Sequence, residues 1–387
     1  MNPFVKSSLL LMLCALLSGC WSKIEINDRN FITSAYVDLS DRPGEIELTV
    51  MSPLPNRLGL TGQTQNGGKG RPFATVTKSG KTLPEAFQNI QSDMTRKLTW
   101  GQTRAVVVSQ AYAERGINEL LEWAARRTYF PLKTFLFIAP GKAKDFTNLT
   151  PIFEQTPSEI LREFANQHTL LDTQIKDVLF AINAKQGTAI TLLSLKSSSL
   201  VSEGGKKGSW AGIGGAALMD KDKMVGTLPH EDAVMIAWAL GSLENPYFSF
   251  QMDEGNFSFA FYRLKTRIQP RVQDGRISYR ISLAAQAGLE QSKGPANLNE
   301  AGIIRRLEQQ MNAKIAADMR TALRKTQKAG ADVLQLGSYL DWYYPKTWEQ
   351  VKERWPQVYA GEVKFDVDVS ITFKRYNSES TPFWTTG

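Results

Sequence analysis

Cysteine and histidine are scarce in this chain of 387 residues, which contains two of each. The four residues are Cys14, Cys20, His168 and His230. This number excludes a four-thiolate metal site and a framework of several disulfides. A finger-type zinc site would need all four residues, and their positions do not fit its spacing. We therefore expect no structural metal, no disulfide scaffold and no cofactor.

Long hydrophobic runs are also missing, apart from one at the start. Residues 9–17 are apolar throughout and follow Lys6. A spanning helix needs about 20 apolar residues, so this run is too short to span and has the form of a secretory signal. Small residues then precede a cysteine, in the order Leu17-Ser18-Gly19-Cys20. This order resembles the bacterial lipoprotein box, in which the cysteine thiol receives a diacylglyceryl group.

We predict that residues 1–19 are a signal peptide, that cleavage falls between Gly19 and Cys20, and that Cys20 carries S-diacylglycerol and N-acyl groups. The alternative is a plain signal peptide that contains a cysteine. After cleavage Cys14 is lost, so a disulfide is no longer possible. The loss of Lys6 takes the formal charge from +8 to +7. Since stable anchoring takes two acyl chains, a diacylated Cys20 would hold the chain on a membrane, where nucleic acid is not an expected partner.

Composition indicates an ordinary folded protein, with 42% hydrophobic and 22% charged residues. These values exclude a mostly disordered chain, a multi-pass membrane protein and a coiled coil. Strand and helix patterns alternate in the first half, which predicts a layered α/β arrangement. The expected strands are 31–37, 45–51, 105–108, 134–139 and 188–195, and the expected helices begin at Thr82 and cover 116–126, 158–168 and 172–184.

The second half reads as hairpins and helices. Asp274-Gly275 joins two extended segments and is a strong signal for a tight turn. The other expected elements are a hairpin at 210–228, a helix at 231–240, extended segments at 247–251, 257–271 and 276–285, a long helix at 299–329, a helical region at 332–355 and a closing strand at 361–376. The predicted fold is therefore α+β or mixed α/β and multi-domain. Mixed sheets pack with helices, and the C-terminal domain has an antiparallel sheet and one long helix.

Changes in composition predict the domain limits. The segment 197–209 is rich in Ser, Gly and Lys and is expected to be a linker. An N-terminal domain would then cover 20–196, with a further split near 145–155 left open. A C-terminal domain would cover 210–376, followed by a tail at 377–387.

Two groups of acidic residues suggest chemistry, a glycoside-hydrolase pair and a metal site at His230, Glu231 and Asp232, and each also has a structural interpretation. Asp366 and Asp368 lie two apart on the closing strand, at a separation that suits glycoside hydrolysis. The same strand face carries other polar residues, so we favour a solvated face. Glu231 and Asp232 follow His230 at a helix start, where acidic residues complement the helix dipole.

Basic residues follow the long helix. Their charge suits either an anionic membrane surface or a solvated face of a structural helix, and we favour the second. These residues are Arg305, Arg306, Lys314, Arg320, Arg324, Lys325 and Lys328. His168 ends a helix, where its side chain can reach the last carbonyl groups. Since no nucleophile stands in a catalytic arrangement, we predict that the chain is not an enzyme.

Both ends of the expected mature chain resemble one family. Cys20-Trp21 with residues 25–28 (EIND) resembles the mature start of the Ger(x)C lipoproteins, the C subunits of nutrient germinant receptors. Leu336-Gly337, residues 343–348 (YYPKTW), Trp355 and the strand at 363–373 resemble the C-terminal signature of that family. Ser22 departs from it, because an Asp is frequent there, and residues 44–71 have little that matches.

The resemblance implies a lipoprotein of the spore inner membrane, on the outer face of the cell membrane, with a mixed α/β fold and no catalysis. It also implies two integral membrane subunits as partners in nutrient sensing. No ligand-binding residue follows from it. The alternatives are a solute-binding lipoprotein that delivers a small molecule to a transporter and, less favoured, a cell-wall hydrolase.

Overall fold

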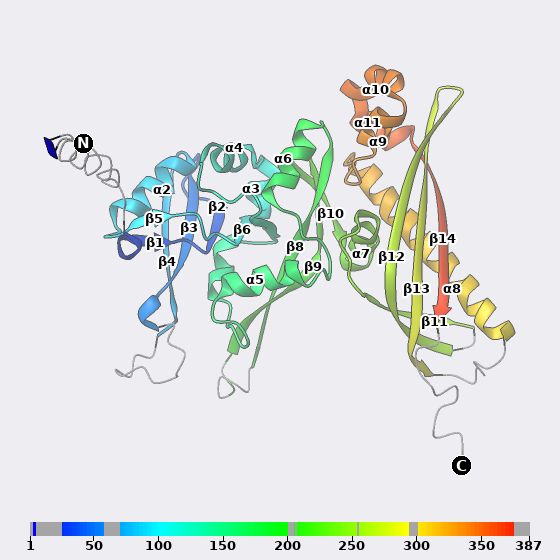
Figure 1. Cartoon of the computed structure of the whole chain (residues 1–387), viewed down its shortest axis with the longest axis horizontal. Coiled ribbons are helices and arrows are strands. Elements are labelled where there is room, and N and C mark those ends of the chain that lie inside the picture. Colours follow the sequence, from blue (N-terminus) through cyan, green and yellow to red (C-terminus); the bar gives the residue numbers. More distant parts are fainter. Residues whose placement is uncertain are drawn as a thin grey trace, which may run out of the picture.

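Buried strands form the centre of the first part of the chain, and their residue ranges agree closely with the segments predicted as strands. The computed structural model describes residues 3–4, 25–57, 70–199, 205, 207–253, 255–293 and 301–374. Eight strands form one sheet in the order β10-β9-β8-β7-β6-β2-β3-β4, drawn in blue to green in Figure 1. They are β2 (Ser34–Leu39), β3 (Ile46–Pro53), β4 (Phe73–Gly80), β6 (Ala105–Ser109), β7 (Phe135–Ala139), β8 (Gly187–Ser199), β9 (Lys207–Asp220) and β10 (Lys223–Pro229).

Strand β6 lies inside this sheet and is covered on both faces. Val106 and Val108 belong to one apolar cluster, and Ala105 and Val107 belong to another on the opposite face. Because β6 pairs in parallel with β2 and β7, the chain must cross over between these strands, and helices form the crossovers. The helices of this part are α2 (Leu83–Ser92), α3 (Gln110–Arg115), α4 (Asn118–Arg126), α5 (Pro157–Asn166) and α6 (Ile175–Asn183). A strand buried on both faces explains the unbroken apolar run at 105–108.

Helix α2 begins where the sequence predicts. The Thr82 hydroxyl accepts a hydrogen bond from the Glu85 backbone N–H at 3.3 Å, and the Glu85 carboxylate accepts one from the Lys81 N–H at 2.9 Å. These bonds satisfy backbone donors that have no partner inside the helix. The capping residue was therefore readable from the sequence.

The expected linker at 197–209 differs from the structure. Residues 197–199 and 207–209 are paired strand ends of β8 and β9, with Ser197 opposite Ser209. The prediction of a linker is wrong for these residues, because an exposed hairpin end tolerates the same Ser, Gly and Lys residues as a linker. Strands β9 and β10 also belong to the large sheet, which therefore continues past the expected boundary at 210.

Gly215 is required in β9, since a Cβ there would lie 2.1 Å from the Leu228 carbonyl oxygen.

A four-stranded sheet forms the second part, in the order β11-β12-β13-β14. Its strands are β11 (Tyr247–Met252), β12 (Gly255–Gln273), β13 (Arg276–Lys293) and β14 (Lys364–Lys374). Asp274 and Gly275 both have positive φ, at 49° and 72°, as the predicted two-residue turn requires. Strand β14 pairs in parallel with β13, so the sheet is antiparallel only from β11 to β13. Parallel neighbours need a long crossover connection, and the helical segment between β13 and β14 supplies it.

Helix α8 (Ala301–Lys328) packs along this sheet (Figure 1). The apolar residues that recur at helical spacing along α8 are buried; they are Ile303, Leu307, Met311, Ile315, Met319 and Leu323. Polar side chains of α8 also bind the free edge of β14. Asn312 Oδ1 accepts from the Ile371 N–H at 2.8 Å, and Glu308 Oε1 accepts from the Phe373 N–H at 2.8 Å. The helix thus supports the sheet and occupies part of its open edge.

Helix α7 (His230–Leu240) connects the two parts. It contacts β9 and β10 of the large sheet as well as β12 and α8, and Figure 1 shows it between the two sheets. Its buried Trp238 packs edge-on against Phe261 of β12, with ring centroids 5.9 Å apart. A helix that is buried on most sides is expected to be apolar on most sides, as α7 is. The predicted mixed α/β architecture of sheets packed with helices is confirmed.

Candidate functional site

The predicted lipidation site, Cys20, and the cleavage position at Gly19 lie outside the described residues. Within the part of the chain that the structure describes, no helix is both long and apolar enough to cross a membrane. The same part holds no group of three or more His, Cys, Asp or Glu side chains arranged for a metal ion.

The segment after α8 folds around a buried carboxylate, Asp332. It is 2% exposed and accepts hydrogen bonds from the Leu336 N–H at 2.9 Å, the Gly337 N–H at 2.9 Å and Trp355 Nε1 at 2.8 Å. Burial raises the pKa of Asp332 to about 6, although these three donors favour its charged form. Asp332 therefore anchors the start of α9 (Leu336–Tyr343) to Trp355 at the start of α11 (Trp355–Gly361).

The residues of the C-terminal signature pack into the same unit. Trp348 of α10 (Pro345–Val351) meets Trp355 edge-on, with ring centroids 5.4 Å apart. A Cβ on Gly337 would lie 2.8 Å from the Trp348 ring, so only glycine fits there without displacement. The buried part of the signature therefore has a structural role.

The two carboxylates on the closing strand are joined by an arginine. Arg280 of β13 lies 2.9 Å from Asp366 and 3.3 Å from Asp368, and both acidic side chains are at least half exposed. The alternating burial of β14 places them on its solvated face, as expected. One guanidinium binds both groups, so the pair has a structural partner on the neighbouring strand.

The two histidines lie in separate parts of the chain. His230 begins α7, and Asp232 in the same turn forms an ion pair with Lys325 of α8. His168 has a positive φ of 47°, and its Nδ1 lies 3.5 Å from Asp172. The expected contact of the His168 side chain with the last helix carbonyls is replaced by this interaction with Asp172.

Several basic residues of α8 have structural partners. Arg320 donates to the Val367 carbonyl at 3.0 Å, and Lys314 lies 2.5 Å from Asp318 on the same helix. Arg324 donates to the Thr321 hydroxyl at 3.0 Å. With the pairing of Lys325 and Asp232, these contacts favour the structural interpretation of this helix face.

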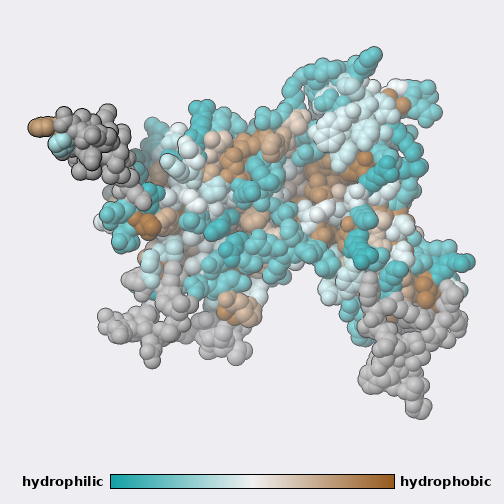
Figure 2. Space-filling model, viewed as in Figure 1, coloured by the Kyte–Doolittle hydropathy of each residue, from teal (hydrophilic) through white to brown (hydrophobic). Residues whose placement is uncertain are grey.

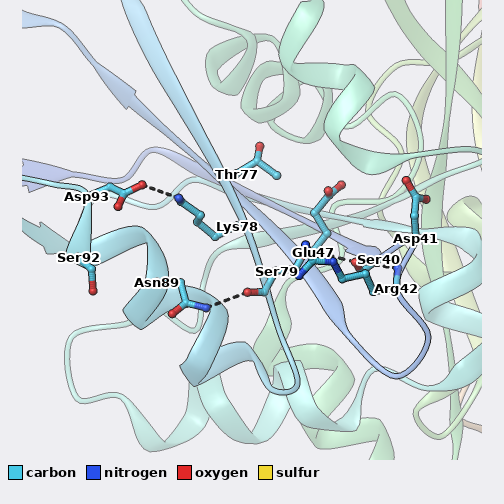
Figure 3. Close-up of a pocket in the computed structure, with 10 residues that line it drawn as sticks. All are labelled: Ser40, Asp41, Arg42, Glu47, Thr77, Lys78, Ser79, Asn89, Ser92 and Asp93. Carbon is cyan, nitrogen blue, oxygen red and sulfur yellow. Dashed lines mark hydrogen bonds and ion pairs between the residues drawn. The ribbon is translucent and has the colours of Figure 1, made fainter.

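A polar cavity of about 610 Å³ lies between β3, β4, α2 and the turn after β2. Figure 3 shows Asn89 of α2 pointing to the Ser79 carbonyl, to which it donates at 2.9 Å. Lys78 on its wall lies 2.5 Å from Asp93, and Glu47 lies 2.8 Å from Lys144. Since these charges of both signs already neutralise one another, the cavity does not favour a ligand of one charge.

A second cavity, of about 600 Å³, lies at the end of the molecule that carries the N-terminus. We call it the basic-aromatic pocket, and its lining residues are Arg29, Phe31, Lys97, Leu98, Thr99, Trp100, Gly101, Arg127, Thr128, Tyr129 and Phe130. A two-stranded parallel sheet forms part of its wall, made of β1 (Arg29–Phe31) and β5 (Lys97–Thr99). The lining carries three cations and no carboxylate. Sequence reasoning missed this pocket because its residues come from three separate segments.

Two family models match the chain in order. The description "Spore germination protein N-terminal domain" covers residues 22–196, and "Spore germination B3/ GerAC like, C-terminal" covers residues 214–377. Together they account for most of the sequence.

The chain belongs to the GerAC family of spore germination proteins.

Curated relatives agree over nearly their whole length. The chain is 24% identical to "Putative spore germination protein YfkR" of Bacillus subtilis (strain 168), over 92% of both chains. It is 21% identical to "Spore germination protein KC" of the same strain, over 97% of this chain and 96% of the relative. It is 24% identical to "Spore germination protein B3", over 96% and 97% respectively. The predicted resemblance to this family of germinant receptor C subunits is confirmed.

A solved structure shares its fold with most of this chain. The structure titled "Crystal Structure of the GerBC protein" superposes on this chain with a TM-score of 0.57 and 16% sequence identity, over 88% of this chain and 97% of that chain. At this identity the likeness concerns the fold alone.

Proposed function

We propose that the chain is the lipid-anchored, non-catalytic C subunit of a nutrient germinant receptor, acting beside two integral membrane subunits. It would lie at the spore inner membrane, on the outer face of the cell membrane. The observation that carries the proposal is the ordered match of both GerAC family models over residues 22–196 and 214–377. The order Leu17-Ser18-Gly19-Cys20 supports the lipid anchor.

The described contacts support a non-catalytic role. Asp366 and Asp368, which suggested a hydrolase, are both bound by Arg280. The buried carboxylate of Asp332 holds two helices together. Packed elements of this kind can move as units, which is one way in which a change passes between subunits.

Deletion of the gene tests the receptor role. In a spore-forming host from which the other germinant receptor genes have been removed, we expect the deletion strain to sporulate normally and to lose germination with the nutrients that the remaining receptor senses. Germination is followed by loss of optical density after nutrient addition. Unchanged germination with every nutrient would contradict the proposal. If the deletion instead stopped uptake of one solute, the solute-binding alternative would be favoured.

A pair of cysteine variants tests the anchor. We expect Cys20→Ala to fail to restore germination and to leave the membrane fraction. Cys14→Ala is the matched control and should restore germination, because this residue is removed with the predicted signal. Mass spectrometry of the N-terminal peptide checks the acyl groups directly. An unmodified Cys20 in a functional chain would contradict the anchor.

A further inference from the structure

The two faces of the four-stranded sheet differ in character. Ile268 of β12 and its register partner Ile281 of β13 lie in the apolar cluster that also holds the buried side chains of α8. Because side chains alternate along a strand, the neighbours of Ile268 in β12 point to the opposite face, which is solvated. Figure 2 shows hydrophilic surface at the end of the β12–β13 hairpin.

A row of cations lies on the solvated face of β12. Lys265, Arg267 and Arg271 are exposed at alternate positions, with Gln269 between the last two. Arg263 is also exposed and precedes them at a bulge, where its φ is 51°. We call these four cations the basic row. Within the part of the chain that the structure describes, no carboxylate pairs with any of them, so the row is open to a partner.

The strand beside the basic row does not neutralise it. The register partners of Lys265, Arg267 and Arg271 are small and uncharged; they are Ala284, Ser282 and Ser278. Gln269 lies opposite Arg280, whose guanidinium is bound to Asp366 and Asp368 of β14. These two carboxylates are therefore satisfied on the far side of β13, and a strip of small side chains separates them from the row.

Helices α7 and α9 pack against the buried face of this sheet. Thr266 donates to the Trp238 carbonyl of α7 at 3.0 Å, and Tyr279 donates to the Leu336 carbonyl of α9 at 2.8 Å. Both donors lie on the same face as Ile268, since their positions alternate with those of the solvated face. The carboxylates of these two helices therefore approach the sheet from the side opposite to the basic row.

Acidic residues flank the two ends of the basic row. Asp274 lies in the hairpin turn, with Arg276 two residues later. Towards the other end, Glu290 lies beside Leu289 on β13, and Glu244 precedes β11. Between these ends, neither β12 nor the facing part of β13 contains an acidic residue. The centre of the row therefore keeps its positive charge and suits an acidic partner.

The spacing and position of the row select a protein segment as that partner. Alternate residues of a strand are about 7 Å apart, and carboxylates at alternate positions of an extended peptide have the same spacing. Figure 1 shows β1 and the four-stranded sheet at opposite ends of the molecule, so lipid on Cys20 would hold the end that lacks the row. Pro270 removes a backbone donor from β12, which favours contact through side chains over an added strand.

We propose that the basic row binds an extended acidic segment of a partner protein, whose carboxylates at alternate positions pair with Lys265, Arg267 and Arg271. The inference goes beyond the proposed receptor role, and it holds whether or not Cys20 carries lipid. An exposed ion pair contributes about twofold to fivefold in affinity, so loss of three pairs should weaken binding by about 10- to 100-fold.

Binding of synthetic peptides tests the basic row. The probe is a fluorescent peptide in which Glu and Thr alternate over the length of the row, and its anisotropy is followed as the full chain, in micelles of a nonionic detergent, is added at low salt. A second peptide of the same composition has its Glu residues in one block, so that successive carboxylates of the extended peptide point to opposite sides. We expect the alternating peptide to bind about threefold more tightly or better, and salt to weaken its binding.

Charge reversal separates docking from protection of the strand. Charges of either sign keep an exposed strand from pairing with another chain, so the combined change of Lys265, Arg267 and Arg271 to Glu should leave the chain monomeric. The same change should weaken binding of the alternating peptide by about 10- to 100-fold or more. Its control makes the same change of net charge at three exposed cations outside the row and should keep most of the binding; these are Arg305, Lys328 and Lys346. If the triple variant aggregates, Lys265→Glu alone should still weaken binding by about twofold to fivefold.

Three results would overturn the proposal. Equal binding of the two peptides shows that the spacing of the row is not recognised, and equal losses in the two triple variants show that only net charge acts. Stronger binding to vesicles that contain phosphatidylglycerol than to the alternating peptide, lost in the variant of the row, would assign the row to a membrane instead of a protein. None of these results bears on the receptor role, which the gene deletion tests separately.

Discussion

Asp332 connects the stability of the second part of the molecule to pH. Its pKa is raised to about 6 in the folded chain from an ordinary value of 3.8, because the carboxyl is buried. The folded state therefore binds the proton more tightly than the unfolded state between these two values. Stability from this group is fully present below pH 4, falls as pH rises towards 6, and is constant above it. The shift corresponds to a loss of about 3 kcal/mol.

The variant Asp332→Asn removes this titration. Its amide cannot ionise, so the fall in stability between pH 4 and 7 should be smaller than in the parent by about 3 kcal/mol. The amide has one acceptor oxygen for the three donors on Leu336, Gly337 and Trp355. We therefore also expect the variant to be less stable than the parent at pH 4, by about 1–3 kcal/mol for each donor left without a partner, and this difference to shrink as the pH rises to 7.

Urea unfolding of the mature chain, measured at intervals from pH 4 to 8, gives both quantities. Tryptophan fluorescence is a suitable signal because the Trp355 indole contacts Asp332 directly. Asp341→Asn on α9 is the control, since Asp341 is exposed and its replacement should leave the pH profile unchanged. Parallel profiles for the parent and Asp332→Asn would refute the reasoning, because another group would then cause the pH dependence.

Two further substitutions test the packing of the second part. Gly337→Ala should destabilise the chain by about 1–3 kcal/mol in thermal unfolding, because the new Cβ would lie 2.8 Å from the Trp348 ring. Gly361→Ala is its control, because a Cβ there would meet nothing within 4 Å. Equal effects of the two substitutions would contradict the argument. Asn312→Ala should speed hydrogen exchange of the Ile371 amide, whose acceptor it removes. Unchanged protection there would show that α8 does not hold this edge.

Local signals in the sequence predicted much of the fold. The apolar run at 105–108, the Thr82 cap and the stripe on α8 each depend on residues close together in the chain. The solvated face with Asp366 and Asp368 was also predicted, since alternation along one strand defines its two faces. These features need no information about which distant segments meet.

Pairing between distant segments explains what the sequence did not predict. Alternation in β14 indicates a strand with one buried face, but it does not say that β13 is its parallel neighbour. The composition of 197–209 fits a hairpin end as well as a linker. The basic-aromatic pocket could not be found either, because β1, β5 and the segment at 127–130 meet only in the folded chain.

The place of β14 at the end of the chain also determines the order of folding. Arg280 of β13 and its partner Asp366 are 86 residues apart, and all of α8 to α11 lies between them. Contacts of such long separation form slowly, because a long loop must close before any of them is made. Until residues 364–374 have been synthesised, β13 lacks its outer neighbour and the polar side chains of α8 lack the backbone groups that they bind. The second part of the molecule can therefore reach its native packing only after residues 364–374 have been made.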